Sequence, residues 1–339
     1  MLSRVAESAY WIARYIERAE NVARCIDVSL QVALDAPGAS PARAGAQWRP
    51  LVAAAGDEAL FVARHDEALA RPGVTDSQVR DTVLHFLTFD EASPNSILSC
   101  VTKARENARQ VRGVLAIETW EHLNRFYHML TSPEARRRAV EAPYDFYSEV
   151  RLASYLFAGI VESTLSRGEV WNFLRLGRYL ERADQTSRIL DVKYFILLPD
   201  PDDVGSVVDD LLWTALLHSV SGHEMFRRRH GRILPGKVVD FLVLDREFPR
   251  AVLFCLLRAE EALLAISGTP MGTFRNGAEK RLSRLRSGLA YSTVEDIVAR
   301  GLHEYLDELQ TGLNGVGESV FETFFAHDAP VQAEAMQEQ

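Results

Sequence analysis

Apolar residues recur at helical spacing along most of the chain. Between positions 3 and 30 they fall three and four residues apart and form one stripe, made of Val5, Ile12, Ile16, Ala19, Ala23 and Ile26. Such spacing is typical of a helix with one face in a core. The same period predicts helices over residues 48–65, 79–89, 96–117, 119–130, 146–166, 279–287 and 293–325. Residues 79–89 could pass for a strand, but no partner strand bounded by turns lies nearby, so we predict an all-α fold.

Polar and glycine- or proline-rich segments separate these helices. Residues 33–47 and 268–278 are predicted loops, and residues 132–143 form a charged connection. Ser93-Pro94 is a suitable cap and first-turn pair for the helix that follows. Residues 326–339 are polar and lack periodicity, which predicts a flexible tail.

One helical pattern occurs twice. ARYIERAENVARCIDV begins at Ala13 and returns as GRYLERADQTSRILDV at Gly177, with eight identities in sixteen and a constant offset of 164. Further on, FLTFDEASP from Phe86 matches FLVLDREFP from Phe241. We therefore predict a multi-helix bundle built from two duplicated halves related by a pseudo-twofold, each with about five helices. The domain would span residues 1–325, with repeats over 3–168 and 169–325.

The repeated helix also repeats a polar stripe. Opposite the apolar face stand Arg14, Glu17, Asn21 and Arg24 in the first copy and Arg178, Glu181, Gln185 and Arg188 in the second. A solvated face would drift after duplication, because surface substitutions usually change stability by less than about 0.5 kcal/mol. This stripe did not drift, which indicates a role for it.

Two interpretations of the stripes stay open. The stripes could pair with each other as Arg–Glu contacts that dock the two halves. They could instead line a cleft and hold an anionic or amino-acid-like ligand, since arginine recognises carboxylates in bidentate geometry. In either case the candidate ligand- or partner-binding residues are Arg14, Glu17, Arg18, Glu20, Asn21, Arg24, Arg178, Glu181, Arg182, Asp184 and Arg188.

A second candidate surface lies in the helix predicted over residues 96–117. Arg105 and Arg109 are four residues apart on one face, and Glu106 adjoins them. The second copy keeps little of this basic face. This difference between the copies is expected if only one half uses the basic face for a contact. Random sequence divergence after duplication would give the same difference.

The sequence contains none of the common catalytic or metal-binding motifs. Glu17/Glu20 and Glu181/Asp184 superficially resemble a di-iron carboxylate bundle, but neither pair has the histidine three residues on that such bundles use. The neighbouring arginines would also neutralise the acids, so no metal is expected. No HExxH, GxSxG, Walker or GxGxxG motif occurs, and no cofactor is expected. An enzyme with Glu17 or Glu181 as general base stays possible, although adjacent arginines would make either acid a poor base.

Composition narrows the class of protein. The net charge of −9 argues against a nucleic-acid binder. Three widely spaced cysteines without a CxxC pair fit a reducing compartment. The first residues do not form a signal peptide, and no apolar run approaches the roughly 20 residues of a membrane span. We expect a soluble, cytoplasmic protein that does not bind membranes.

Several long segments carry a family resemblance. LSRVAESAYWIARYIERAEN, SPNSILSCVTKARENARQVR with ETWEHLN, LRLGRYLERADQTSRILDV and the tripeptide Phe248-Pro249-Arg250 resemble the bacterial alpha-E domain family, from Met1 to about residue 325. One departure is Ala13, where many members have glycine.

The resemblance implies an all-helical protein that is encoded beside, or fused to, a circularly permuted ATP-grasp protein and a transglutaminase-like protein. We therefore expect a helical partner subunit of an ATP-grasp-type amide or peptide ligase system. It would bind substrate or assemble the complex through the repeated Arg/Glu helices. The alternatives are the stand-alone enzyme and a purely structural scaffold.

Overall fold

A computed structural model describes residues 1–35, 48–196 and 207–326 of the chain. Within these ranges it contains sixteen α-helices and no β-strand, which confirms the predicted all-α fold. The first part forms α1 (Ser3–Asp35), α2 (Arg49–Ala55), α3 (Glu58–Leu69), α4 (Asp76–Phe89), α5 (Ile97–Gln110), the 3₁₀ turn η1 (Arg112–Val114), α6 (Ile117–Thr131), α7 (Ala135–Glu141) and α8 (Pro143–Thr164).

The second part begins with another long helix and ends in a π-helical turn. It forms α9 (Glu169–Ile196), α10 (Val207–Ser219), α11 (His223–His230), α12 (Pro235–Val239), the π-helical turn η3 (Asp240–Leu244), α13 (Val252–Ser267), α14 (Gly277–Ala290), α15 (Val294–Arg300), α16 (Leu302–Val320) and η4 (Phe321–Phe325). Residues 327–339 of the predicted tail and most of the predicted loop over 33–47 lie outside the described residues.

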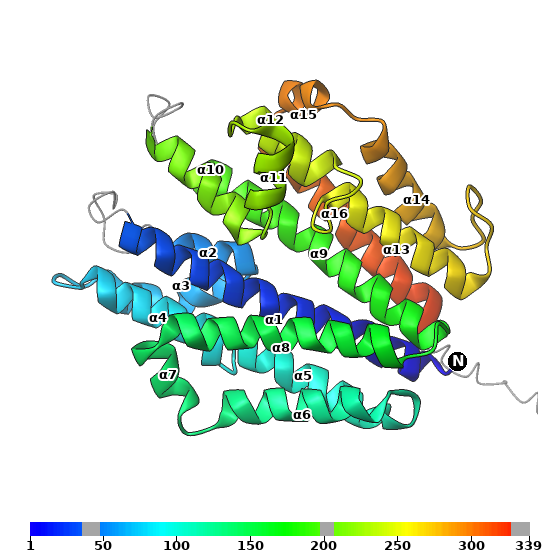
Figure 1. Cartoon of the computed structure of the whole chain (residues 1–339), viewed down its shortest axis with the longest axis horizontal. Coiled ribbons are helices and arrows are strands. Elements are labelled where there is room, and N and C mark those ends of the chain that lie inside the picture. Colours follow the sequence, from blue (N-terminus) through cyan, green and yellow to red (C-terminus); the bar gives the residue numbers. More distant parts are fainter. Residues whose placement is uncertain (36–47, 197–206, 327–339) are drawn as a thin grey trace, which may run out of the picture.

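The two long helices α1 and α9 form the centre of the molecule. They lie side by side, with α4 to α8 on one side of the pair and α11 to α16 on the other (Figure 1). They run parallel and in register, because their polar contacts join Arg14 to Glu181, Glu17 to Arg182, and Asn21 to Gln185. We call the contact surface between α1 and α9 the seam.

The two backbones approach closely at one glycine. A Cβ atom added to Gly177 of α9 would lie 2.2 Å from the carbonyl oxygen of Tyr10 in α1. No real Cβ atom tolerates that distance, so glycine is required for the present spacing of the two helices. The corresponding residue of the first copy, Ala13, is itself buried, at 2% exposure.

The structure corrects several predicted boundaries. The helix predicted over 48–65 is broken at Gly56, whose φ of +81° is left-handed and ends α2. The helix predicted over 96–117 ends at Gln110, and α5 then folds back against α6 through η1. The connection predicted over 132–143 contains α7. The helix predicted over 293–325 is divided into α15 and α16 at Gly301, where φ is +94°.

Two further expectations were wrong. Ser96, not Ser93, caps α5, because its Oγ accepts a hydrogen bond from the backbone N–H of Ser99 at 3.1 Å. Ser93 donates instead to Asp57, at 2.5 Å. The expected five helices per half is also too few, since α1 to α8 alone are eight. The pseudo-twofold relation between the halves stays a prediction.

Among the described residues, no helix is both long and apolar enough to cross a bilayer.

Candidate functional site

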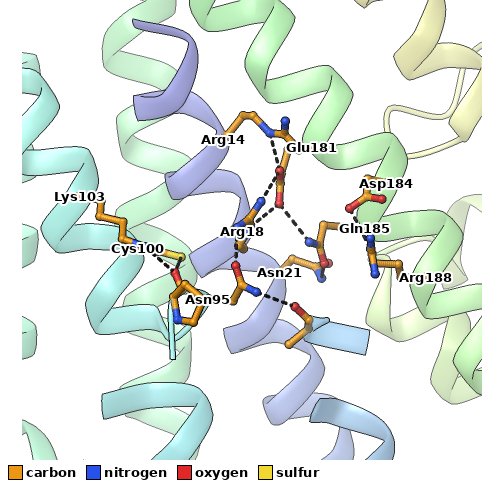
Figure 2. Close-up of polar contacts among 12 residues, drawn as sticks. Arg14, Arg18, Asn21, Asn95, Cys100, Lys103, Glu181, Asp184, Gln185 and Arg188 are labelled. Atoms are coloured by element: carbon orange, nitrogen blue, oxygen red, sulfur yellow. Dashed lines mark hydrogen bonds and ion pairs between the residues drawn. The ribbon is translucent and has the colours of Figure 1, made fainter. Parts of the chain in front are cut away.

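The predicted polar stripes of α1 and α9 face each other across the seam. At its centre, Glu181 is fully buried, and its carboxylate accepts hydrogen bonds from two arginines of α1 (Figure 2). Arg14 donates through Nε at 2.7 Å, and Arg18 donates through Nε at 2.6 Å and Nη2 at 3.0 Å. Gln185, one turn along α9, adds a fourth hydrogen bond at 3.0 Å.

A reciprocal arrangement surrounds Glu17, which is 7% exposed. Arg182 of α9 holds its carboxylate in a bidentate grip, with Nε at 2.6 Å and Nη2 at 2.8 Å. Arg250, two residues before the start of α13, adds a hydrogen bond to Glu17 at 3.2 Å and another to Glu20 at 3.0 Å. Each repeat thus supplies arginines for the acid of the other.

The remaining stripe residues pair across the seam or along their own helix. Asn21 donates to Gln185 at 2.7 Å, and both side chains are buried. Within α1, Arg24 donates to Glu20, and within α9, Arg188 donates to Asp184 at 2.9 Å. The stripes therefore mostly satisfy each other, which favours the first of the two interpretations.

Two arginines are left with unsatisfied groups. Arg178 is 8% exposed and makes no hydrogen bond or ion pair within the described part of the chain. Its counterpart Arg14, by contrast, binds Glu181. Arg24 is fully buried, and its Nε and Nη1 find no acceptor among the described residues. Burial lowers the pKa of both arginines, and nearby arginine charges lower it further.

The acids of the seam are held in the charged form. Burial by itself would raise the pKa of Glu17, but the charge and hydrogen bonds of Arg182, followed by Arg250, outweigh it and bring the pKa to about 2. Arg18 and Arg14 likewise outweigh burial at Glu181 and lower its pKa. A carboxylate held so strongly in the charged form is a poor general base near neutral pH. The geometry thus disfavours proton-transfer catalysis by either acid.

Two hollows of very different volume lie beside the seam. One cavity of about 30 Å³ lies between α1, α8 and α9, and its lining includes Ile16, Glu20, Ser154, Phe157 and Arg178. A larger groove of about 590 Å³ lies between α1, α9, α16 and η4. Within the described ranges, no group of three His, Cys, Asp or Glu side chains is placed to hold a metal ion.

The second predicted surface lies apart from the seam, between α5 and α6. Arg105 donates to Asn124 at 2.8 Å, and its guanidinium lies 4.5 Å from the ring centre of Tyr127. Glu106 pairs with Arg105 at 2.9 Å and with Arg109 at 2.7 Å. These contacts join α5 to α6 and place none of the three residues at the seam.

Sequence reasoning missed the residues that support the seam from outside. Arg18 donates to Asn95 (Figure 2). Asn95 in turn donates to Asp57 at 2.8 Å and to the carbonyl of Ala55 at 3.2 Å. On the other side, the corresponding support is Arg250. Asn95 follows Pro94 and Arg250 follows Pro249, the two prolines that recur between the repeats. This shared position in the repeats was the signal that could have identified both residues.

Comparison with known proteins identifies relatives but no known activity. An uncharacterised protein of Mycobacterium bovis and uncharacterised proteins of two strains of Mycobacterium tuberculosis are each 23% identical over 331 residues. The match covers 92% of this chain and 35% of each relative, so the chain spans about a third of the length of these curated relatives. No solved structure matches.

Residues 1–325 match the model of the Alpha-E family, described as a predicted alpha-helical domain with a conserved ER motif. Glu-Arg occurs at two places in this sequence, at Glu17-Arg18 and Glu181-Arg182. In the structure these two dipeptides pair reciprocally, Glu17 with Arg182 and Glu181 with Arg18. The family's named motif therefore forms the centre of the seam, and the chain belongs to the Alpha-E family.

Proposed function

We propose that this chain is the helical partner subunit of an ATP-grasp-type amide or peptide ligase system. It would contribute substrate binding or assembly, and the ATP-grasp protein would carry out the nucleotide chemistry. The support for an ATP-grasp partner is the family resemblance, which also implies a transglutaminase-like protein in the same system. In the mycobacterial relatives, the matched region is joined to a longer chain, which fits a domain that works together with other parts.

The observation that carries the non-catalytic half of this proposal is the state of the seam acids. Glu17 and Glu181 are each bound by two arginines, and both carboxylates are buried. The arginines lower the pKa of both acids, so neither is suited to remove a proton from a substrate. An enzyme that uses Glu17 or Glu181 as general base is therefore the less favoured alternative.

The surface that best fits a protein partner lies on α8. Leu152, Tyr155 and Leu156 fall on one face of this helix and are 61%, 44% and 53% exposed. Contiguous exposed apolar side chains of this kind often mark a protein interface. We assign this face to the ATP-grasp partner; in Figure 1, α8 lies in the foreground, toward the viewer.

The proposal is tested by co-expressing the chain with the ATP-grasp protein encoded beside it and measuring the mass of the complex in solution. We expect a stable complex that is lost when Leu152 and Leu156 are both changed to Glu. Val298→Glu is the matched control, because Val298 is 62% exposed on the distant helix α15. Absence of any complex would leave the structural scaffold as the better interpretation.

A further inference from the structure

The two hollows beside the seam are built from corresponding positions of the repeated helix. The small cavity is lined by Ile16, Glu20 and Arg178, and the groove is lined by their counterparts Leu180, Asp184 and Arg14. The outer wall comes from α8 in the first case and from α16 in the second. The small cavity has a volume of about 30 Å³ and the groove about 590 Å³, so only the groove has room for an organic ligand.

The two hollows differ in the cations that their acids receive. Glu20 binds two arginines, Arg24 from its own helix and Arg250 from the other repeat. Asp184 binds Arg188 from its own helix, but the residue that corresponds to Arg250 is Asn95. The amide of Asn95 is uncharged and already binds Arg18 and Asp57. Asp184 therefore lacks the second cation that Glu20 has.

Only one of the two carboxylate oxygens of Asp184 accepts a hydrogen bond from a described residue. The residue is 7% exposed, and its Oδ2 accepts from Arg188 at 2.9 Å. Its Oδ1 is buried and receives no donor from any described residue. Oε1 of Glu20 also lacks a donor, because both of its arginines bind Oε2, so the two acids differ in the number of arginines bound and not in this unpaired oxygen. A buried carboxylate oxygen without a donor is unfavourable, because it has lost its water without gaining a hydrogen bond.

The rest of the groove also favours a cation. Glu318 on α16 and Glu322 on η4 are exposed at its rim, and neither forms an ion pair or a hydrogen bond with another described residue. The one arginine in the lining, Arg14, is already bound to Glu181 at 2.7 Å and to the hydroxyl of Tyr10 at 3.0 Å. The groove thus has two acidic side chains without a partner, Glu318 and Glu322, and its one lining arginine is already paired.

Aromatic side chains form the apolar walls. Trp11, Phe321 and Phe325 line the groove, and Phe321 is 49% exposed. Aromatic faces attract both apolar groups and organic cations. The groove thus combines a buried carboxylate oxygen, two rim acids and an aromatic wall.

From this combination we infer that the groove binds a primary ammonium group carried on an apolar or aromatic chain. The ammonium would take the place beside Asp184 that Arg250 takes beside Glu20, and Glu318 and Glu322 would add long-range attraction. The chain of the ligand would lie against Phe321 and Trp11. If this ligand is the amine substrate of a ligase, that assignment rests on the proposed function. Binding by the isolated chain does not depend on it.

The inference is tested with the isolated protein by ligand-observed ¹⁹F NMR, with 4-fluorophenethylamine as the probe. We expect the signal to broaden on addition of protein and to sharpen again when unlabelled phenethylamine or phenylalanine amide competes. 3-Phenylpropionate has a similar shape and the opposite charge, and it should not compete. Absence of broadening at millimolar probe, or equal competition by the carboxylate, would overturn the inference.

Variants locate the bound probe. Asp184→Asn should weaken binding at least about tenfold, since it removes a charged hydrogen bond. Should that buried change impair folding, Glu318→Gln with Glu322→Gln alters only exposed side chains and should also weaken binding. Gly317→Leu should block the groove, because a Cβ at Gly317 would already lie 3.9 Å from Arg14.

Glu304→Gln is the matched control, because Glu304 is exposed on α16 outside the groove and its loss should leave binding unchanged. Equal binding by folded wild-type and groove variants would place the probe elsewhere and refute the site. The measurement needs no ATP-grasp protein, so a failed complex and a failed ligand site are distinguishable.

Discussion

Replacement of Glu181 by Gln is the sharpest test of how the seam is held together. The substitution keeps the shape of the side chain and removes its charge. In the folded protein this carboxylate is fully buried and accepts hydrogen bonds from Arg14, Arg18 and Gln185. The amide of Gln offers one acceptor oxygen in place of two, and its nitrogen would face guanidinium N–H groups. Arg14 and Arg18 would lose the only acid that pairs with them among the described residues.

The expected loss of stability follows from the buried charges. Removal of one partner from a buried ion pair typically destabilises a protein by about 3–5 kcal/mol, because the other charge is left uncompensated. Individual hydrogen bonds to charged groups contribute about 1.5–3 kcal/mol each, but these contributions overlap with the pairing energy and do not add to it. We therefore expect Glu181→Gln to lower the free energy of unfolding by about 3–5 kcal/mol.

Urea unfolding followed by far-ultraviolet circular dichroism measures this change. Glu169→Gln is the matched control on the same helix, because Glu169 is 51% exposed and pairs with the N-terminal amine at 3.2 Å. An exposed pair of this kind contributes at most about 1 kcal/mol. A cost below about 1 kcal/mol for Glu181→Gln as well would refute the conclusion that the seam depends on its buried charges.

Three further outcomes follow from the seam. Arg178→Met should be close to neutral in urea unfolding, whereas Arg182→Met should cost about 1.5–3 kcal/mol, because only Arg182 binds a buried acid and its loss removes two charged hydrogen bonds to Glu17, which keeps Arg250. Equal costs would contradict the assignment of Arg178 as unpaired. Gly177→Ala should destabilise the protein by about 1–3 kcal/mol, because the added Cβ clashes with the carbonyl of Tyr10. Gly288→Ala is the control: space around its Cβ is open, so it should stabilise the protein by up to about 1 kcal/mol. A stabilised Gly177→Ala would be inconsistent with the close approach of α1 and α9. Glu17 has a pKa of about 2 in the folded chain and an ordinary value of 4.5, so between these pH values the unfolded chain binds more protons and stability falls as pH falls. Unfolding free energies measured from pH 6 to pH 2.5 should therefore drop below about pH 4.5, and Glu17→Gln should drop less; a flat profile in the wild type would argue against the lowered pKa.

The sequence alone was enough to predict the fold class and the importance of the repeated helix. Both depend on periodicity, which is a local property of the sequence: the spacing of Ile12, Ile16 and Ile26 predicts a buried helix face without knowledge of the tertiary contacts. Helix ends were predicted less well. Gly56 and Gly301 end helices because their backbones adopt positive φ. The sequence alone does not show whether a glycine within an apolar pattern adopts positive φ or continues the helix.

The pairing within the site could be predicted only in part. Charge types and spacing predicted Arg–Glu pairing between the stripes as one of two interpretations, but they could not show that Arg178 makes no ion pair while Arg14 binds Glu181. That outcome depends on Arg250, which is distant in sequence and reaches Glu17 and Glu20 from the start of α13. The groove beside Asp184 could not be predicted either, since it is formed by the packing of α16 against α9 and of η4 against α1.

ADP release is the measurement that tests the proposed division of labour most directly. The purified chain, its ATP-grasp neighbour and their mixture would each be incubated with ATP, Mg²⁺ and a panel of amines and amino acids. We expect no ADP from this chain alone, and amine-dependent ADP release that is greater in the mixture than with the ATP-grasp protein alone. ADP or amide formation by this chain alone, or a mixture no more active than the ATP-grasp protein by itself, would contradict its role as a non-catalytic partner subunit.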